Sequence, residues 1–141
     1  MKKPALDNLA RTGQLKTEPA AQAELDGLTH SGGVRLADAA NPALNLESRF
    51  DLAYNAAHAL SLAALRWHGF RSESRYLVFQ CLTHTLDLPA EQWRVLDRAH
   101  HKRNLAEYEG HLEIDEAVVT ALIRVTTEVD ARLRALGKPC P

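Results

Sequence analysis

The sequence predicts an all-α protein, built as an antiparallel up-and-down four-helix bundle core with additional N-terminal helices. Apolar residues recur at three- and four-residue steps through most of the chain, which is the period of an amphipathic helix. Strand-forming residues gather only at 77–79 and 118–119, and both places lie inside helical patterns. Glycine, proline and asparagine mark short breaks between the helices, and long helices joined by short loops pack antiparallel.

The size and the charge of the chain limit its organisation and its partners. Its 141 residues fit one domain. We expect residues 1–16 to form a short N-terminal helix or arm, residues 17–137 the helical bundle domain, and residues 138–141 a disordered tail. The 17 basic residues nearly balance the 18 acidic ones, so a nucleic-acid footprint over a whole face is excluded and any basic patch must be local.

The sequence carries no sign of export or of membrane insertion. No apolar segment follows the lysines at the N-terminus, as a signal peptide requires, and no apolar stretch approaches the ~20 residues of a membrane span. Cys81 lies in an apolar run, which predicts a buried thiol, and Cys140 lies between two prolines in the expected tail. We therefore expect a cytoplasmic, bacterial-type protein that has no membrane contact and no disulfide.

The first half of the chain predicts three helices. A short helix spans residues 5–12, and a second follows Thr17 and runs to Ala40. Gly32 and Gly33 weaken the second helix by ~1 kcal/mol each relative to alanine, which predicts a kink or a break there. The third helix extends from the capping residue Asn45 to about His68, and its inner stripe is rich in alanine, which permits a close helix–helix approach. This stripe consists of Phe50, Ala53, Tyr54, Ala57, Leu60, Ser61, Ala64 and Trp67.

The second half predicts three more helices. They span residues 74–86, residues 87–108 with Asp87 as the cap, and residues 115–136 with Asp115 at the start. Gly110 ends the second of these helices, and Gly137 ends the third. The last helix has one apolar stripe, made of Val118, Leu122, Val125, Val129 and Leu133. We expect the third to sixth helices to form the four-helix core, with the second helix laid against it.

The inner stripe of the helix over 87–108 changes from apolar to polar halfway along. It begins with Trp93 and Leu96 and continues, at three- and four-residue steps, through His100, Arg103 and Glu107. Either this end of the helix emerges from the bundle, or it lines a cleft or a subunit interface. A solvated helix end is the simpler interpretation, since cations favour a helix C-terminus by ~0.3–1 kcal/mol each.

The position of Arg103 on the inner stripe leads to a prediction about burial. Arg103, Asn104 and Glu107 should be partly buried at a helix–helix or subunit contact. A buried arginine without a partner costs several kcal/mol, so Arg103 should be paired. Glu107 is the nearest partner in the chain, and a further partner should come from Asp51 or Tyr54, or from a second subunit.

The segment from Arg103 to Tyr108, Arg-Asn-Leu-Ala-Glu-Tyr, resembles the arginine–polar motif of the HEPN domains. The alanine-rich helix from Arg49, which ends at Gly69, is similar to the HEPN helix that precedes a glycine turn, and the resemblance covers about residues 46–136. It implies a helical bundle that dimerises with the two motifs facing each other. Many such domains are metal-independent ribonucleases, often toxins paired with a nucleotidyltransferase antitoxin, and others only bind nucleotides or RNA. It also implies that Arg103 contacts a phosphate and that Asn104 orients it.

The sequence departs from this motif at Tyr108, where the family carries a histidine. A tyrosine, with a pKa near ~10, does not serve as a base near neutral pH without a large shift. Our first hypothesis is therefore a homodimeric module that binds RNA or a nucleotide phosphate without cutting it. Its ligand-binding residues would be Arg103, Asn104, Glu107, Tyr108, His100 and Lys102.

Two alternatives remain open. The protein could be a metal-independent endoribonuclease of a toxin–antitoxin pair, with Arg103 and with His100 or His111 as the base. It could also be a structural or interaction protein without a ligand, in which the polar stripe only stabilises an interface. The histidines form no compact ligand motif with carboxylates, so we expect no metal and no cofactor.

Overall fold

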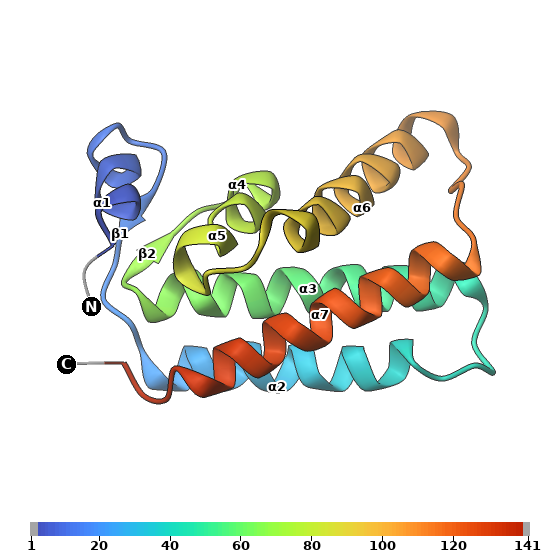
Figure 1. Ribbon diagram of the computed structural model, residues 1–141, viewed down its shortest axis with the longest axis horizontal. Helices are drawn as coiled ribbons and strands as arrows, with labels where there is room; N and C mark the ends of the chain where they lie inside the picture. The colour runs from blue at the N-terminus through green and yellow to red at the C-terminus, as the bar shows by residue number, and fades with distance from the viewer. Residues whose placement is uncertain (1–2, 140–141) are drawn as a thin grey trace.

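The computed structural model describes residues 3–139, and it confirms the all-α fold. Long helices alternate in direction along the chain, as an up-and-down bundle requires (Figure 1). These helices are α2 (Gln22–Ala39), α3 (Leu46–Trp67), α6 (Ala90–Glu109) and α7 (Glu116–Ala135). Shorter helices lie at the end of the bundle where the described chain begins: α1 (Pro4–Arg11), α4 (Arg75–Gln80) and α5 (Leu82–Thr85).

Helix α3 is the centre of the bundle, because it packs against both α2 and α7 along its length. Its inner face is made of fully buried small and aromatic side chains, as the alanine-rich stripe predicts. The expectation that α2 is only laid against a four-helix core of the later helices is wrong. Helix α2 is one of the long bundle helices and forms the most extensive packing with α3.

The expected break at Gly32 and Gly33 is wrong, since α2 continues through both residues. Gly32 is buried against α3, and a Cβ atom added to it would lie 2.6 Å from Cγ of Leu60. The glycine therefore lets the two helices approach closely, and this packing offsets its low helix propensity.

The helix expected over residues 74–86 is divided into α4 and α5, which meet at Cys81. Ser74 caps α4, with its hydroxyl accepting a hydrogen bond from the backbone N–H of Leu77 at 3.2 Å. Asp87 was expected to cap the next helix, but it adopts a left-handed conformation with φ of 53°, and Pro89 precedes α6 instead. Arg132 of α7 stabilises this turn by donating hydrogen bonds to the carbonyl oxygen atoms of Leu86 and Asp87.

Two short strands, which the sequence did not predict, join the N-terminal segment to the end of α3. They are β1 (Lys16–Thr17) and β2 (Phe70–Arg71), and they pair antiparallel. Arg66, only 1% exposed, donates hydrogen bonds to Glu24 at 2.7 Å and to the carbonyl oxygen atoms of Glu18 and Pro19. A two-residue strand has no detectable period, so these tertiary contacts define it rather than the local sequence.

The remaining expectations about the chain concern its cysteines and its end. Cys81 is buried as expected, and burial raises the pKa of its thiol to about 11. Lys138 and Pro139 follow α7 without regular secondary structure, and Cys140, with the rest of the expected tail, lies outside the described residues. Within the described chain, no helix has the length and apolar character needed to span a membrane.

Candidate anion-binding site

The C-terminal half of α6 leaves the bundle. Leu96 and Ala99 are the buried residues of this helix, and both lie in its first half. Beyond them the helix rises away from α3 and α7 (Figure 1), and Leu105 and Tyr108 are 56% and 92% exposed. The inner stripe therefore turns polar where the helix leaves the core. This agrees with the first explanation offered by the sequence, in which this end of the helix emerges from the bundle.

Tyr54 of α3 contacts several polar side chains at the place where α6 leaves the bundle. Its ring is buried, and its hydroxyl group lies 3.0 Å from Nδ1 of His100. The other ring nitrogen of His100 lies 3.1 Å from the amide nitrogen of Asn104. If the Asn104 amide donates to Nε2, the proton of the neutral imidazole is on Nδ1 and is donated to the Tyr54 hydroxyl. Both nitrogen atoms of His100 are thus engaged.

Two arginines contact the same tyrosine ring. Cζ of Arg103 lies 5.0 Å from the centroid of the Tyr54 ring, and Cζ of Arg75 lies 5.5 Å from it. Arg75 donates a hydrogen bond to the neutral side chain of Asn55 at 3.2 Å. Arg103 pairs with Glu107 at 3.7 Å, and the Glu107 side chain is 68% exposed. We call Tyr54, Arg75, His100, Arg103 and Asn104 the Tyr54 cluster.

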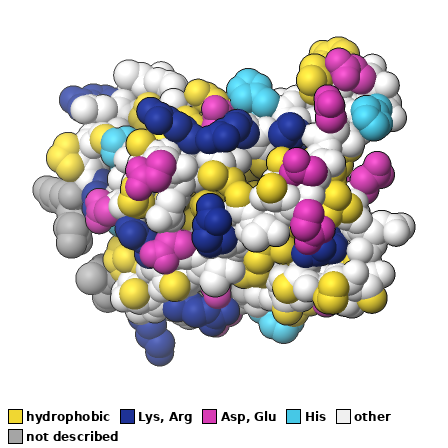
Figure 2. Space-filling view, turned by 45° about the vertical axis from the view of Figure 1, so that its right-hand side comes forward, with side chains coloured by type: hydrophobic (Ala, Val, Ile, Leu, Met, Phe, Trp, Pro, Cys, Tyr) yellow, Lys and Arg dark blue, Asp and Glu magenta, His cyan; other side chains and the backbone are white. Residues whose placement is uncertain are grey.

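The positive charge of the Tyr54 cluster comes from its arginines. Burial lowers the pKa of His100, and the neighbouring His101 lowers it further, so the imidazole is neutral near pH 7. One turn along α3 from Tyr54, burial and then Arg75 lower the pKa of His58 to about 4. On the face drawn in Figure 2, Lys and Arg side chains gather across the upper part of the molecule, and acidic side chains lie below them.

The structure brings together only some of the expected site residues. Arg103, His100 and Asn104 meet at Tyr54, with Glu107 beside them. Lys102 is on another face of α6, where its ammonium group donates to the carbonyl oxygen of Glu113 at 3.1 Å. The exposed Tyr108 has no aromatic or hydrogen-bonded contact with the cluster among the described residues.

The burial prediction is confirmed for Arg103, whose side chain is 33% exposed. Within the chain Asn104 and Glu107 are exposed, because this part of α6 has left the bundle, so no helix–helix contact buries them and burial at a subunit contact stays a prediction. The expected partner from α3 is Tyr54, and Asp51 forms no ion pair with Arg103 in the described chain.

The sequence interpretation missed Arg75, which is the second cation of the cluster. It lies at the start of α4, in a segment that carries no motif, and only the packing of α4 against α3 and α6 brings it to Tyr54. A spacing pattern within one helix can reveal His100 with Arg103, but no such pattern connects α4 with α6.

Comparison with protein-family models, with curated proteins and with solved structures finds no significant match for this chain. The fold and the geometry of the site are therefore the evidence on function. Among residues 3–139, His, Cys, Asp and Glu side chains form no group of three that could hold a metal ion. The chemical feature that stands out is a pair of arginines around one buried tyrosine.

Proposed function

We propose that the protein binds a phosphate group of RNA or of a nucleotide at the Tyr54 cluster, without cutting the ligand. One observation carries this proposal: two guanidinium groups lie within 5.5 Å of the centroid of one buried ring. Guanidinium groups bind phosphate oxygens through paired, charge-assisted hydrogen bonds. Because the two groups come from different helices and contact the same ring, we infer that one phosphate is bound by both of them.

The two arginines of the Tyr54 cluster are only weakly offset by ion pairs with carboxylates. Arg75 forms no ion pair with a carboxylate among the described residues, and its partner is the uncharged Asn55. Among the same residues, Arg103 forms its ion pair with the largely exposed Glu107, and such a surface pair contributes little, about 0–1 kcal/mol. A bound anion would relieve the repulsion between the two arginines, which favours phosphate over a neutral ligand.

The state of His100 supports binding rather than cleavage. A general base needs a free lone pair within reach of the proton that it removes. In the cluster, Nδ1 of His100 is engaged by Tyr54 and Nε2 by Asn104, so neither nitrogen is free. Tyr108, which stands where the HEPN motif has its histidine, is 92% exposed at the end of α6 and does not complete the cluster.

We further propose that the site lies at a homodimer interface. Leu105 and Tyr108 are large, exposed hydrophobic residues one turn apart on the part of α6 that leaves the bundle. Pairing two such helix ends would cover these side chains and bring two Tyr54 clusters together. Light scattering of the wild type and of Leu105→Glu tests this, with a monomeric variant and a dimeric wild type as the expected result.

Salt-dependent binding of a labelled single-stranded RNA tests the proposed function. The logarithm of the affinity falls with the logarithm of the salt concentration, with a slope of about −0.7 for each phosphate contact on a single strand. Arg103→Gln and Arg75→Gln should each weaken binding, and the double variant should reduce the slope by about 0.7, the contribution of one phosphate. Arg124→Gln is the matched control, because Arg124 is exposed on α7, away from the cluster.

The proposal fails if the wild type binds neither RNA nor nucleotides at low salt, where phosphate contacts are strongest. It also fails if Arg124→Gln weakens binding as much as Arg103→Gln. In that case the general surface charge, and not the Tyr54 cluster, would be responsible for the affinity.

A metal-independent endoribonuclease, with a nucleotidyltransferase antitoxin as its partner, is the second candidate. The lowered pKa of His100 favours it, since a base must be unprotonated near neutral pH. Cleavage of single-stranded RNA in EDTA by the wild type, Arg103→Gln and His100→Gln discriminates the two functions. Loss of cleavage in both variants would favour the enzyme, whereas no cleavage by the wild type would leave the binding function.

A further inference from the structure

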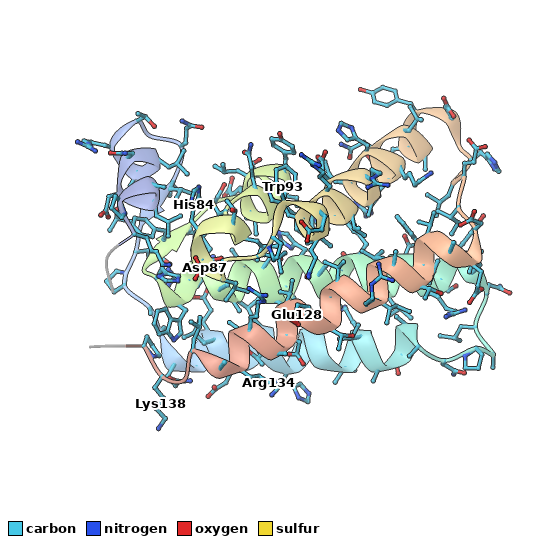
Figure 3. The ribbon with its side chains drawn as sticks, viewed as in Figure 1. His84, Asp87, Trp93, Glu128, Arg134 and Lys138 are labelled. Carbon is cyan, nitrogen blue, oxygen red and sulfur yellow. The ribbon has the colours of Figure 1, made fainter. Side chains whose placement is uncertain are left out.

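A concave site, separate from the Tyr54 cluster, lies between α1 and the α4–α5 segment. It is a cleft of about 660 Å³, within the range of about 300–1,000 Å³ that is typical of ligand pockets. Trp93 of α6 contributes to its wall, and in Figure 3 His84 lies on the side of α5 that faces α1. The polar lining comes from three segments and includes Asn8, Gln14, Gln80, Thr83 and His84.

The lining of the cleft combines apolar and uncharged polar side chains, and it carries no acidic residue, lysine or arginine. It contains amides, hydroxyl groups, one imidazole and the indole of Trp93. Among residues 3–139, the side chains of Asn8, Thr83 and Trp93 form no hydrogen bond to another residue, so their donors and acceptors are available to a ligand. An uncharged lining with several free hydrogen-bonding groups and an aromatic wall suits a neutral, flat, polar ring.

The cleft adjoins the Tyr54 cluster along two helices. Trp93 and His100 lie two turns apart on the same side of α6, which corresponds to about 10 Å along the helix axis. On α4, Gln80 lines the cleft and donates a hydrogen bond to the hydroxyl of Tyr76, at 3.5 Å. The ring of Tyr76 in turn lies 6.1 Å from the ring of His100. The two sites are thus connected through Gln80 and Tyr76.

We infer that the cleft binds a nucleobase, stacked on Trp93 and hydrogen-bonded by the amides of Asn8 and Gln80, while the attached phosphate reaches the Tyr54 cluster. Every base has a flat face for stacking and an edge of donors and acceptors that side-chain amides can match. The uncharged cleft and the cationic cluster would thus recognise the two chemically different ends of one nucleotide. The linkage between the two sites rests on the phosphate-binding function proposed above, whereas the affinity of the cleft for a base does not.

Separate titrations of the two ends of the ligand test this inference. Calorimetry would measure adenosine, guanosine, cytidine and uridine as uncharged probes, and inorganic phosphate as the anionic probe. Base–aromatic stacking contributes enough that Trp93→Leu should weaken nucleoside binding about 5- to 150-fold and leave phosphate binding unchanged. Arg103→Gln should do the reverse. Asn8→Ala, a change of an exposed residue on α1, should weaken nucleoside binding without affecting the bundle.

Fluorescence gives an independent readout of the cleft. The chain has two tryptophans, so Trp67→Phe leaves Trp93 as the single indole, and stacked nucleosides should quench it. Wild-type protein that binds no nucleoside at millimolar concentration would overturn the inference. Equal nucleoside binding by the wild type, Trp93→Leu and Asn8→Ala would overturn it as well.

The titrations separate the two proposals. Nucleoside binding without phosphate binding would support the cleft and refute the function proposed for the Tyr54 cluster. Phosphate binding without nucleoside binding would do the opposite. A nucleoside monophosphate that binds the wild type no more tightly than its nucleoside would refute the linkage between the two sites.

Discussion

Two glycines of α2 should respond in opposite directions to the same substitution. Gly32 is buried against α3, and a Cβ atom placed on it would lie 2.6 Å from Cγ and 2.7 Å from Cδ2 of Leu60. Gly27 lies one and a half turns earlier on the same helix, and a Cβ atom there would have no neighbour within 4 Å. The pair therefore separates the effect of close packing from the effect of helix propensity.

The expected magnitudes follow from these two environments. Alanine in place of glycine inside a helix stabilises by about 0.5–1 kcal/mol, and Gly27→Ala should show this gain. At Gly32 the same gain is opposed by overpacking, which typically costs about 1–3 kcal/mol. Leu60 is fully buried and has no space to move away, so Gly32→Ala should lower the free energy of unfolding by about 1–2 kcal/mol.

Urea denaturation of the wild type and of both variants, followed by circular dichroism, measures these free energies. If Gly32→Ala were as stable as Gly27→Ala, the packing of α2 on α3 would leave room for a Cβ atom at Gly32, contrary to our expectation. If Gly27→Ala were destabilised, the gain expected from the higher helix propensity of alanine would not apply to α2.

Three further outcomes are expected. Arg66→Ala should lower the free energy of unfolding by about 3 kcal/mol, because it removes a buried charge with several hydrogen bonds, whereas Arg124→Ala should have little effect. The depressed pKa of His58 means that the unfolded chain binds its proton first, so stability should fall as the pH drops from about 6.5 to about 4, and His58→Gln should flatten this part of the profile. Cys81 should react with thiol reagents only on unfolding, since its pKa is raised to about 11 and it is buried; rapid labelling of the native protein would contradict this.

Local sequence signals predicted the helices well where a side chain acts on its own segment. Helix α7 starts where expected, after Asp115, whose carboxylate caps it by accepting a hydrogen bond from the N–H of Val118 at 2.9 Å. Gly110 ends α6 in the left-handed conformation that glycine adopts most easily. These features need no information from elsewhere in the chain.

The sequence could not predict features that depend on contacts between distant segments. Asp87 looks like a cap, but Arg132 of α7 fixes the turn that contains it. The strands β1 and β2 are too short to have a pattern, and they form where Arg66 holds the N-terminal segment. The packing of α2 on α3 at Gly32 likewise depends on a partner that the local sequence does not reveal.

Part of the candidate site could likewise be predicted from the sequence. The spacing of His100 and Arg103 on one helix placed two members of the Tyr54 cluster, the resemblance added Asn104, and Tyr54 was among the partners expected for Arg103. Arg75 could not be found in this way, because its part in the cluster depends on how α4 packs. Lys102 and Tyr108, which the basic patch and the resemblance added to the expected site, lie away from the cluster, since neither signal indicates where α6 leaves the bundle.

The proposed function requires that Arg75 and Arg103 bind one phosphate together. Nuclear magnetic resonance of the arginine side-chain Nε–H groups, during titration with a nucleoside monophosphate, observes both residues at once. The signals of Arg75 and Arg103 should shift in parallel and saturate at the same ligand concentration, while the signal of Arg124 stays in place. Shifts of Arg124 equal to those of the pair, or no shift of Arg75 and Arg103, would contradict the claim.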